Sequence, residues 1–181
     1  LVVGAYLFAV SGVWPPLVAV ESESMVPNME VNDLVFVMEE ERFPGANARD
    51  DTGVVTARAA DDYRKFGQQG DVIVFAPKGN DEVTPIIHRA MFWVEEGENW
   101  YDRADGDFVG SAPACETDDD NSTDTGLKNC PAPHAGFITK GDNNGLYDQA
   151  GFGGAQTGPV KPEWVVGTAE FRIPGLGWVR L

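Results

Sequence analysis

The chain is poor in the residues from which metal sites and many catalytic sites are built. Its 181 residues include only two histidines and two cysteines, and these show none of the ligand spacings typical of zinc sites. We therefore expect no metal and no other cofactor. Basic residues are also scarce, with 13 Lys and Arg against 29 Asp and Glu. The resulting net charge of −16 makes nucleic acid a poor partner.

Long helical periodicity is equally scarce, whereas glycine and proline, at 21 and 12 residues, imply many turns. Short runs rich in Val, Ile, Phe and Trp recur between Gly, Asp and Asn, which is typical of strands. These runs cover residues 34–38, 72–75, 86–94, 136–139 and 164–172. The pattern predicts a mainly β fold.

Two polar stretches interrupt these runs and are predicted to be surface insertions. The first covers about residues 39–69 and is expected to include a short helix near 57–66. The second covers about residues 95–135 and contains Cys115 and Cys130. A disulfide between these cysteines would close a short loop, contributing roughly 3 kcal/mol, and would imply an oxidising, extracytoplasmic location. We predict this disulfide.

Residues 1–20 contain no charged side chain. Twenty residues in a helix span about 30 Å, the thickness of a bilayer core. Pro15 and Pro16 would break such a helix, so we expect it to lie before Trp14, with this residue at the membrane interface. The sequence thus predicts a membrane anchor over 1–20, with a cleaved signal or a buried core helix as alternatives.

Few residues are available for acid–base or nucleophilic chemistry. His88 lies in an apolar run, and His134 lies in a proline-flanked loop. Of the five serines, Ser22 and Ser24 follow the predicted anchor directly. A serine hydroxyl needs a neighbouring base to act as a nucleophile, and histidine is the usual base near neutral pH. The structural alternatives are a core histidine bonded to a carbonyl and a turn or helix-capping serine.

Asp142 is the third candidate, in the stretch ITKGDNNGLYD, with Asp148 six residues further on. A catalytic aspartate would hold the tautomer of an imidazole and stabilise the imidazolium. Alternatively, an aspartate in such a turn caps its own backbone.

Six motifs occur in an order that resembles type I signal peptidases. They are SMVPNM (24–29), NDLVFV (32–37), GDVIVF (70–75), IHR (87–89), TKGDNN (139–144) and the pair WVVG (164–167) with RIP…GW (172–178). Bacterial members place a lysine before the arginine of the fourth motif, where this chain has His88. The sequence is therefore similar to the archaeal and endoplasmic-reticulum type, and its acidic composition suggests a halophilic archaeon.

The resemblance implies roles for individual residues. Ser24 corresponds to the nucleophile, His88 to the general base, Asp142 to the aspartate of the last catalytic motif, and Asp148 to a second aspartate implicated in archaeal members. The Ser22 hydroxyl and the Ser24 amide are implied to hold the oxyanion, and Met25 and Pro27 to contact substrate. Glu23 replaces the glycine often found between the two serines, and we expect its carboxylate to face solvent.

The implied protein has a signal-peptidase-like antiparallel β-sheet catalytic domain over residues 21–181, on the extracytoplasmic face of the cell membrane. It would be a serine endopeptidase that removes signal peptides from exported preproteins. Its partners would be signal peptides, the lipid bilayer and the protein translocation machinery. Alternatives are a Ser–Lys dyad using Lys140 in the same fold, and a non-catalytic anchored β-domain that binds exported peptides. Activity is expected to change little on reduction, since neither cysteine belongs to a motif.

Overall fold

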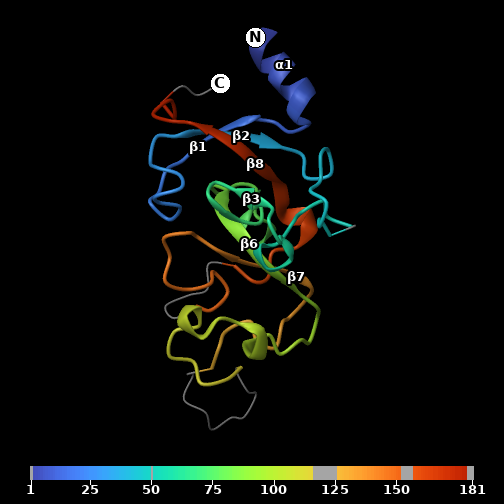
Figure 1. The fold of residues 1–181 in the computed structure, drawn as a ribbon, viewed down its shortest axis with the longest axis vertical. Helices are drawn as coiled ribbons and strands as arrows, with labels where there is room; N and C mark the ends of the chain where they lie inside the picture. The colour runs from blue at the N-terminus through green and yellow to red at the C-terminus, as the bar shows by residue number, and fades with distance from the viewer. Residues whose placement is uncertain (1, 50, 116–125, 152–156, 179–181) are drawn as a thin grey trace.

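The protein is built around one six-stranded antiparallel sheet, with strand order β1-β2-β8-β5-β6-β7 in a computed structural model (Figure 1). The structure describes residues 2–49, 51–115, 126–151 and 157–178. The strands are β1 Leu17–Ala19, β2 Leu34–Met38, β5 Val72–Phe75, β6 Ile86–Val94, β7 Gly136–Lys140 and β8 Val165–Ile173, and a separate hairpin pairs β3 Arg64–Lys65 with β4 Gln68–Gln69. The mainly β prediction is confirmed, and each predicted strand lies within one residue of an observed one.

Among the described residues, helical structure is limited to one α-helix and five short 3-10 turns. They are α1 Val2–Ser11, η1 Ala57–Ala59, η2 Pro77–Gly79, η3 Tyr101–Arg103, η4 Gly106–Phe108 and η5 Pro162–Trp164. The predicted helix near 57–66 is wrong, because only the η1 turn is helical there and the chain then enters β3.

The N-terminal apolar run divides between a helix and the sheet. α1 ends at Ser11, and Leu17–Ala19 pair with β2 as an edge strand. The end of the predicted 1–20 anchor is therefore part of the sheet, because prolines 15 and 16 stop the helix and the exposed edge of β2 accepts a strand. Within the described ranges, no helix combines the length and apolarity that a bilayer crossing requires.

The central strands are apolar without alternation because both faces of the sheet are covered. On β5, Val72 and Val74 pack into one cluster with β2, whereas Ile73 and Phe75 pack into another with β7. All four side chains are fully buried. The sheet thereby gives a rigid support for side chains at the ends of its strands.

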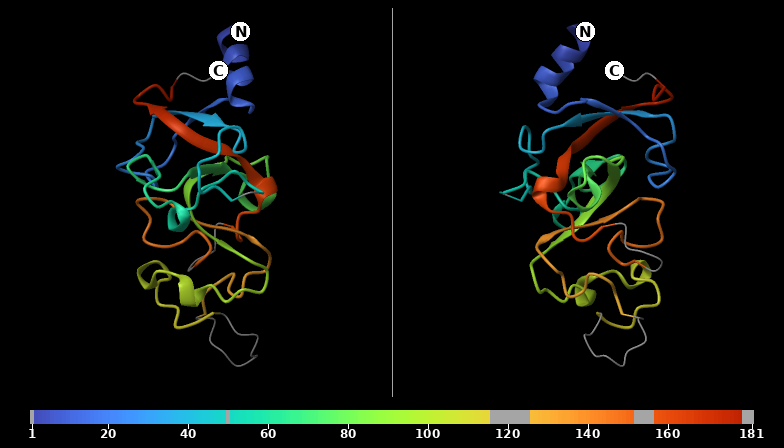
Figure 2. Two further views of the ribbon diagram at one scale, coloured as in Figure 1. Left: turned by 45° about the vertical axis from the view of Figure 1, so that its right-hand side comes forward. Right: turned by 180° about the vertical axis from the view of Figure 1, so that it is seen from behind.

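The second insertion packs into an apolar cluster that it shares with Phe92 and Val94 of β6 and Ile138 of β7. Trp100, Val109 and Leu127 are buried there, and a disulfide joins Cys115 to Cys130 with Cα atoms 4.8 Å apart. We call its described part, residues 95–115 and 126–135, the disulfide lobe. It lies at the end of the molecule opposite α1 (Figures 1 and 2). This segment is thus a packed lobe rather than an extended surface loop.

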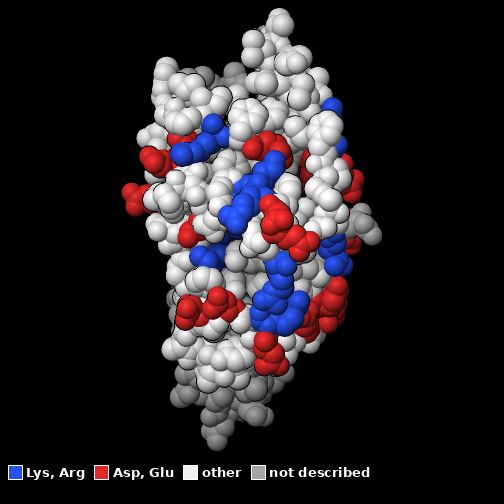
Figure 3. All heavy atoms as spheres, in the orientation of Figure 1, with Lys and Arg blue, Asp and Glu red and all other residues white. Residues whose placement is uncertain are grey.

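Charges of both signs are mixed on the face of the molecule seen in Figure 1. Lys and Arg side chains run through its middle, with Asp and Glu among and beside them (Figure 3). Several charged side chains of the protein form ion pairs, including Lys65 with Glu170 and Arg103 with Glu98. This face is therefore not a uniformly acidic coat despite the net charge of −16.

Candidate functional site

A cleft of about 800 Å³ lies between β1 and the beginning of β6, and both Ser24 and His88 line it. Its remaining lining is mostly apolar: Pro15, Leu17, Val18, Ala19, Val20, Met25, Leu34, Val74, Pro85, Ile86, Ile87 and Val166, with Glu21, Ser22, Thr84 and Asn144. The sheet thus brings together two candidates that are 64 positions apart in the sequence.

His88 is held by Asp148, not by Asp142. Its Nδ1 lies 2.6 Å from Asp148 Oδ2, and both side chains are almost fully buried. Because one imidazole nitrogen faces the carboxylate, the other is left to exchange protons elsewhere. Asp148 thereby takes the orienting position for which the sequence offered two candidates.

Asp148 is fixed in turn by the strand from which its loop departs. Its backbone N–H donates to the Thr139 carbonyl, and the Thr139 hydroxyl donates to Asp148 Oδ2 at 2.7 Å. Gln149 supports this arrangement by accepting from the Thr139 backbone N–H and donating to the Thr139 hydroxyl. Thr139 and Gln149 are fully buried. No role for either side chain follows from the sequence.

Asp142 has a different partner because strand residues alternate between faces. His88 and Arg89 are adjacent on β6, so their side chains point to opposite sides of the sheet. Arg89 donates from Nε and Nη2 to the two oxygens of Asp142, at 2.8 and 2.7 Å. The prediction that Asp142 orients the imidazole is therefore wrong, because Arg89 occupies its carboxylate.

Asp142 and its neighbour instead hold the segment that carries Ser24. Asn28 donates to Asp142 Oδ2 at 2.8 Å, and the Asn143 backbone N–H donates to the Ser24 carbonyl at 2.8 Å. At Gly141 an added Cβ would lie 2.7 Å from that same carbonyl, so only glycine permits this approach. The 21–33 and 141–151 segments accordingly lie side by side in both Figures 1 and 2.

The surroundings of Ser24 are polar and partly open. Its Oγ lies 3.0 Å from the Ser22 Oγ, and no hydrogen bond joins it to His88 within the described part of the chain. The Ser24 backbone N–H likewise donates to no group that the structure describes, which leaves it available to an incoming oxygen. Glu23 is exposed, as expected from its position between two serines.

The other predicted contact residues divide between the cleft and the surface. Met25 is buried, lines the cleft, and accepts the Asp142 backbone N–H on its sulfur at 3.4 Å. Pro27 is exposed and does not line the cleft. His134 lies elsewhere, with its ring against Trp164.

Lys140 lies outside the cleft lining. Its ammonium donates to the carbonyls of Gly141 and Asn144 and lies 4.4 Å from the centre of the Phe108 ring. Burial lowers the pKa of Lys140, although the carboxylates of Asp142 and Asp148 oppose this effect. With its donors directed at loop carbonyls, Lys140 stabilises the turn after β7.

No family model matches this chain, and no curated protein matches it. Among the described residues, no group of three or more His, Cys, Asp or Glu side chains is placed to hold a metal ion. The groups that the structure places at this site are the Ser24 hydroxyl, the His88 imidazole, the buried Asp148 carboxylate and backbone amides.

Proposed function

We propose that this chain is a serine endopeptidase of the archaeal and endoplasmic-reticulum signal-peptidase type, which cuts signal peptides from exported preproteins. One observation carries the proposal: His88, which is hydrogen-bonded to the buried Asp148, lines the same cleft as Ser24. The order of the sequence motifs supplies the family, and the geometry of the cleft supports a peptide substrate.

In this mechanism His88 accepts the proton of Ser24 as its oxygen attacks the scissile carbonyl. Asp148 keeps Nδ1 protonated, so that Nε2 receives the proton and later passes it to the leaving amine. In the reactive state the Ser24 hydroxyl rotates away from Ser22 and donates to His88. Catalytic hydrogen bonds are often not formed until substrate is bound. The free Ser24 N–H and the Ser22 hydroxyl then stabilise the oxyanion.

The cleft suits an extended peptide because two unpaired strand edges border it. Among the described residues, β1 pairs with β2 alone, and Ile86–His88 of β6 pair with β5 alone, since pairing with β7 begins at Arg89. A peptide lying between these edges can form main-chain hydrogen bonds with either. The apolar lining favours uncharged side chains around the cut, as signal peptides carry.

Exposed apolar side chains support a position at the membrane surface. Tyr6, Phe8 and Trp14 are exposed on and after α1, and Phe171 and Trp178 are exposed near the described C-terminal end. α1 and the described residues that follow β8 lie at the same end of the molecule (Figures 1 and 2). Aromatic residues favour the bilayer interface, so this end would hold the cleft near the end of a substrate's apolar helix.

The geometry favours His88 over Lys140 as the base. The ammonium of Lys140 is directed at carbonyls of its own loop, whereas His88 lines the cleft. A peptide-binding domain without catalysis would not need the buried carboxylate that holds His88.

The test is cleavage of a preprotein in membranes, with the new N-terminus identified by mass spectrometry. Ser24→Ala and His88→Ala should each lose about 10⁶-fold in kcat. Ser111→Ala, at an exposed serine of the disulfide lobe, is the matched control and should cleave normally. Normal cleavage by Ser24→Ala would refute the proposal. An active His88→Ala with an inactive Lys140→Ala would establish the Ser–Lys alternative.

A further inference from the structure

The disulfide lobe belongs to none of the six motifs, yet it contacts the loop that carries Asp148. We propose that Phe108 of this lobe is a positioning residue, which holds the 140–148 loop so that Asp148 stays on His88. This inference rests on the proposed function for its catalytic consequence. Its structural part, the orientation of His88, can be measured without any activity.

The first contact is with Tyr147, the residue before Asp148. The Tyr147 backbone N–H donates to the Phe108 carbonyl at 3.0 Å, and the two rings meet edge to face at 5.5 Å and 85°. The Tyr147 hydroxyl also accepts from the backbone N–H of Asp105, in the same lobe. Tyr147 is buried, so its backbone cannot shift without disturbing the lobe.

The second contact is at the other end of the loop. The Lys140 ammonium lies 4.4 Å from the centre of the Phe108 ring, within the range of a cation–π interaction. The same ammonium donates to the Gly141 and Asn144 carbonyls. One lobe residue therefore touches the loop at both of its ends, directly at Lys140 and Tyr147.

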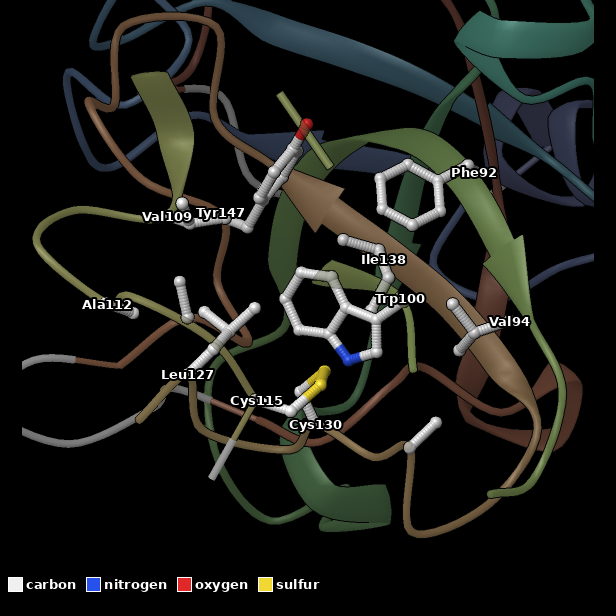
Figure 4. Packing of buried hydrophobic residues seen from close by; sticks show 12 residues of the cluster. Phe92, Val94, Trp100, Val109, Ala112, Cys115, Leu127, Cys130, Ile138 and Tyr147 are labelled. Carbon is white, nitrogen blue, oxygen red and sulfur yellow. A yellow bond between two sulfur atoms is a disulfide. The ribbon is translucent and has the colours of Figure 1, made fainter. Parts of the chain in front are cut away.

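The lobe that presents Phe108 is itself held firmly. Tyr147 packs edge to face against Phe92 of β6 and Trp100 of the lobe, and these rings pack with the Cys115–Cys130 disulfide in one cluster (Figure 4). The indole N–H of Trp100 donates to the backbone carbonyl of residue 129, next to the disulfide.

A further link joins the lobe to the residues behind Asp148. The Asn129 side chain donates to the Gln149 carbonyl at 3.0 Å, and Gln149 supports Thr139. Both the lobe's aromatic contacts and this hydrogen bond therefore reach the residues flanking Asp148. The expectation that reduction leaves activity unchanged does not fit this arrangement, because the lobe touches the loop on both sides of Asp148.

Phe108→Ala should lower kcat by about 100-fold, as expected when a reacting group shifts by about 1 Å. KM should change little, because Phe108 does not line the cleft. Phe108→Leu, which keeps an apolar side chain in place of the ring, should recover part of the loss. Tyr101→Ala is the matched control and should keep kcat, since Tyr101 packs on the same lobe core and, among the described residues, forms no hydrogen bond or ring contact with residues 140–149.

The independent readout is the NMR signal of the His88 imidazole. The chain has only two histidines, so His134→Gln leaves a single imidazole to observe. In this background the proton between His88 Nδ1 and Asp148 should give a downfield resonance, which Phe108→Ala should weaken or shift. The double variant Cys115→Ala with Cys130→Ala should change it in the same direction.

An unchanged resonance and an unchanged kcat in Phe108→Ala would overturn the inference. If kcat falls equally in Tyr101→Ala, the effect is general loosening of the lobe, and the assignment to Phe108 fails. If the wild-type chain cleaves no preprotein, the proposed function fails, but the resonance still decides whether Phe108 positions the His88–Asp148 pair.

Discussion

His88 and Arg89 are adjacent on β6 and are buried on opposite faces of the sheet, where their hydrogen-bond surroundings differ. On one face, Arg89 forms two hydrogen bonds with Asp142, and it also donates to the carbonyls of Lys65, Gln69 and Gly70 at the end of the first insertion and just after it. On the other face, His88 has one side-chain partner among the described residues, Asp148. Two adjacent residues of β6 thus have different roles: Arg89 stabilises the fold, and His88 takes part in the proposed catalysis.

The two side chains differ in how many of their hydrogen-bonding atoms have a partner. Arg89 is 1% exposed, and its guanidinium donates to both oxygens of Asp142 and to three backbone carbonyls. His88 is 3% exposed, but within the part of the chain that the structure describes only Nδ1 of its two ring nitrogens has a hydrogen-bond partner. A fully satisfied pair fixes the fold, whereas a half-satisfied one can take part in chemistry.

The largest expected effect comes from removing the carboxylate that holds His88. Asp148→Asn should lower kcat on the order of 10³–10⁴-fold, because an amide no longer enforces the required tautomer. The fold should survive, since the asparagine oxygen can still accept from Thr139. Cleavage kinetics and urea unfolding measured on the same preparation would show both effects.

The corresponding change on the other face sharpens the contrast. Asp142→Asn should lower the free energy of unfolding by about 3–5 kcal/mol, since it leaves the buried Arg89 without its counter-ion. If Asp142→Asn kept full stability and lost only kcat, the division of roles between the two carboxylates would be incorrect.

The next effect in size concerns Arg89 itself. Arg89→Met should lower the free energy of unfolding by about 3–5 kcal/mol, because Asp142 is left buried and unpaired and three carbonyls lose their donor. Arg42→Met is the control: its ion pair with Glu39 is solvent-exposed and should contribute less than about 1 kcal/mol. Equal losses in the two variants by urea unfolding would contradict this account.

The sequence was sufficient to predict β2, β5, β6, β7 and β8 and to single out Ser24 and His88 in the cleft, for physical reasons. β2, β5 and β6 are apolar runs bounded by turn residues, and a strand covered on both faces requires such a run. Ser24 and His88 stand out because serine and histidine are rare here and their motifs are ordered.

Other features depend on contacts that sequence alone does not reveal. Residues 17–19 contain no polar alternation, so only pairing with β2 distinguishes them from a helix. The choice between Asp142 and Asp148 depends on which face of β6 each reaches. The disulfide lobe was missed as a packed unit because Trp100 and Leu127 are isolated apolar residues among polar ones.

The smallest expected effect concerns the pH dependence of stability at Asp71, under the first insertion. Burial raises the pKa of Asp71, against hydrogen bonds from the Val55 backbone N–H and the Tyr63 hydroxyl that lower it. A raised carboxyl pKa means that the folded state binds more protons than the unfolded state as pH rises above the ordinary value of 3.8. Stability from this group is therefore present below that value and is lost as pH rises through the folded pKa.

Asp71→Asn removes this titration while keeping a side-chain oxygen for Val55. The free energy of unfolding of the wild type should therefore fall relative to that of Asp71→Asn as pH rises from about 3.5 toward neutrality. The expected fall is about 1.4 kcal/mol for each unit of pKa shift. Other carboxylates titrate in both proteins, and their contributions cancel in the difference. Urea unfolding at several pH values measures it. A difference that stayed constant, or that moved in favour of the wild type, would mean that the hydrogen bonds from Val55 and Tyr63 outweigh burial at this position.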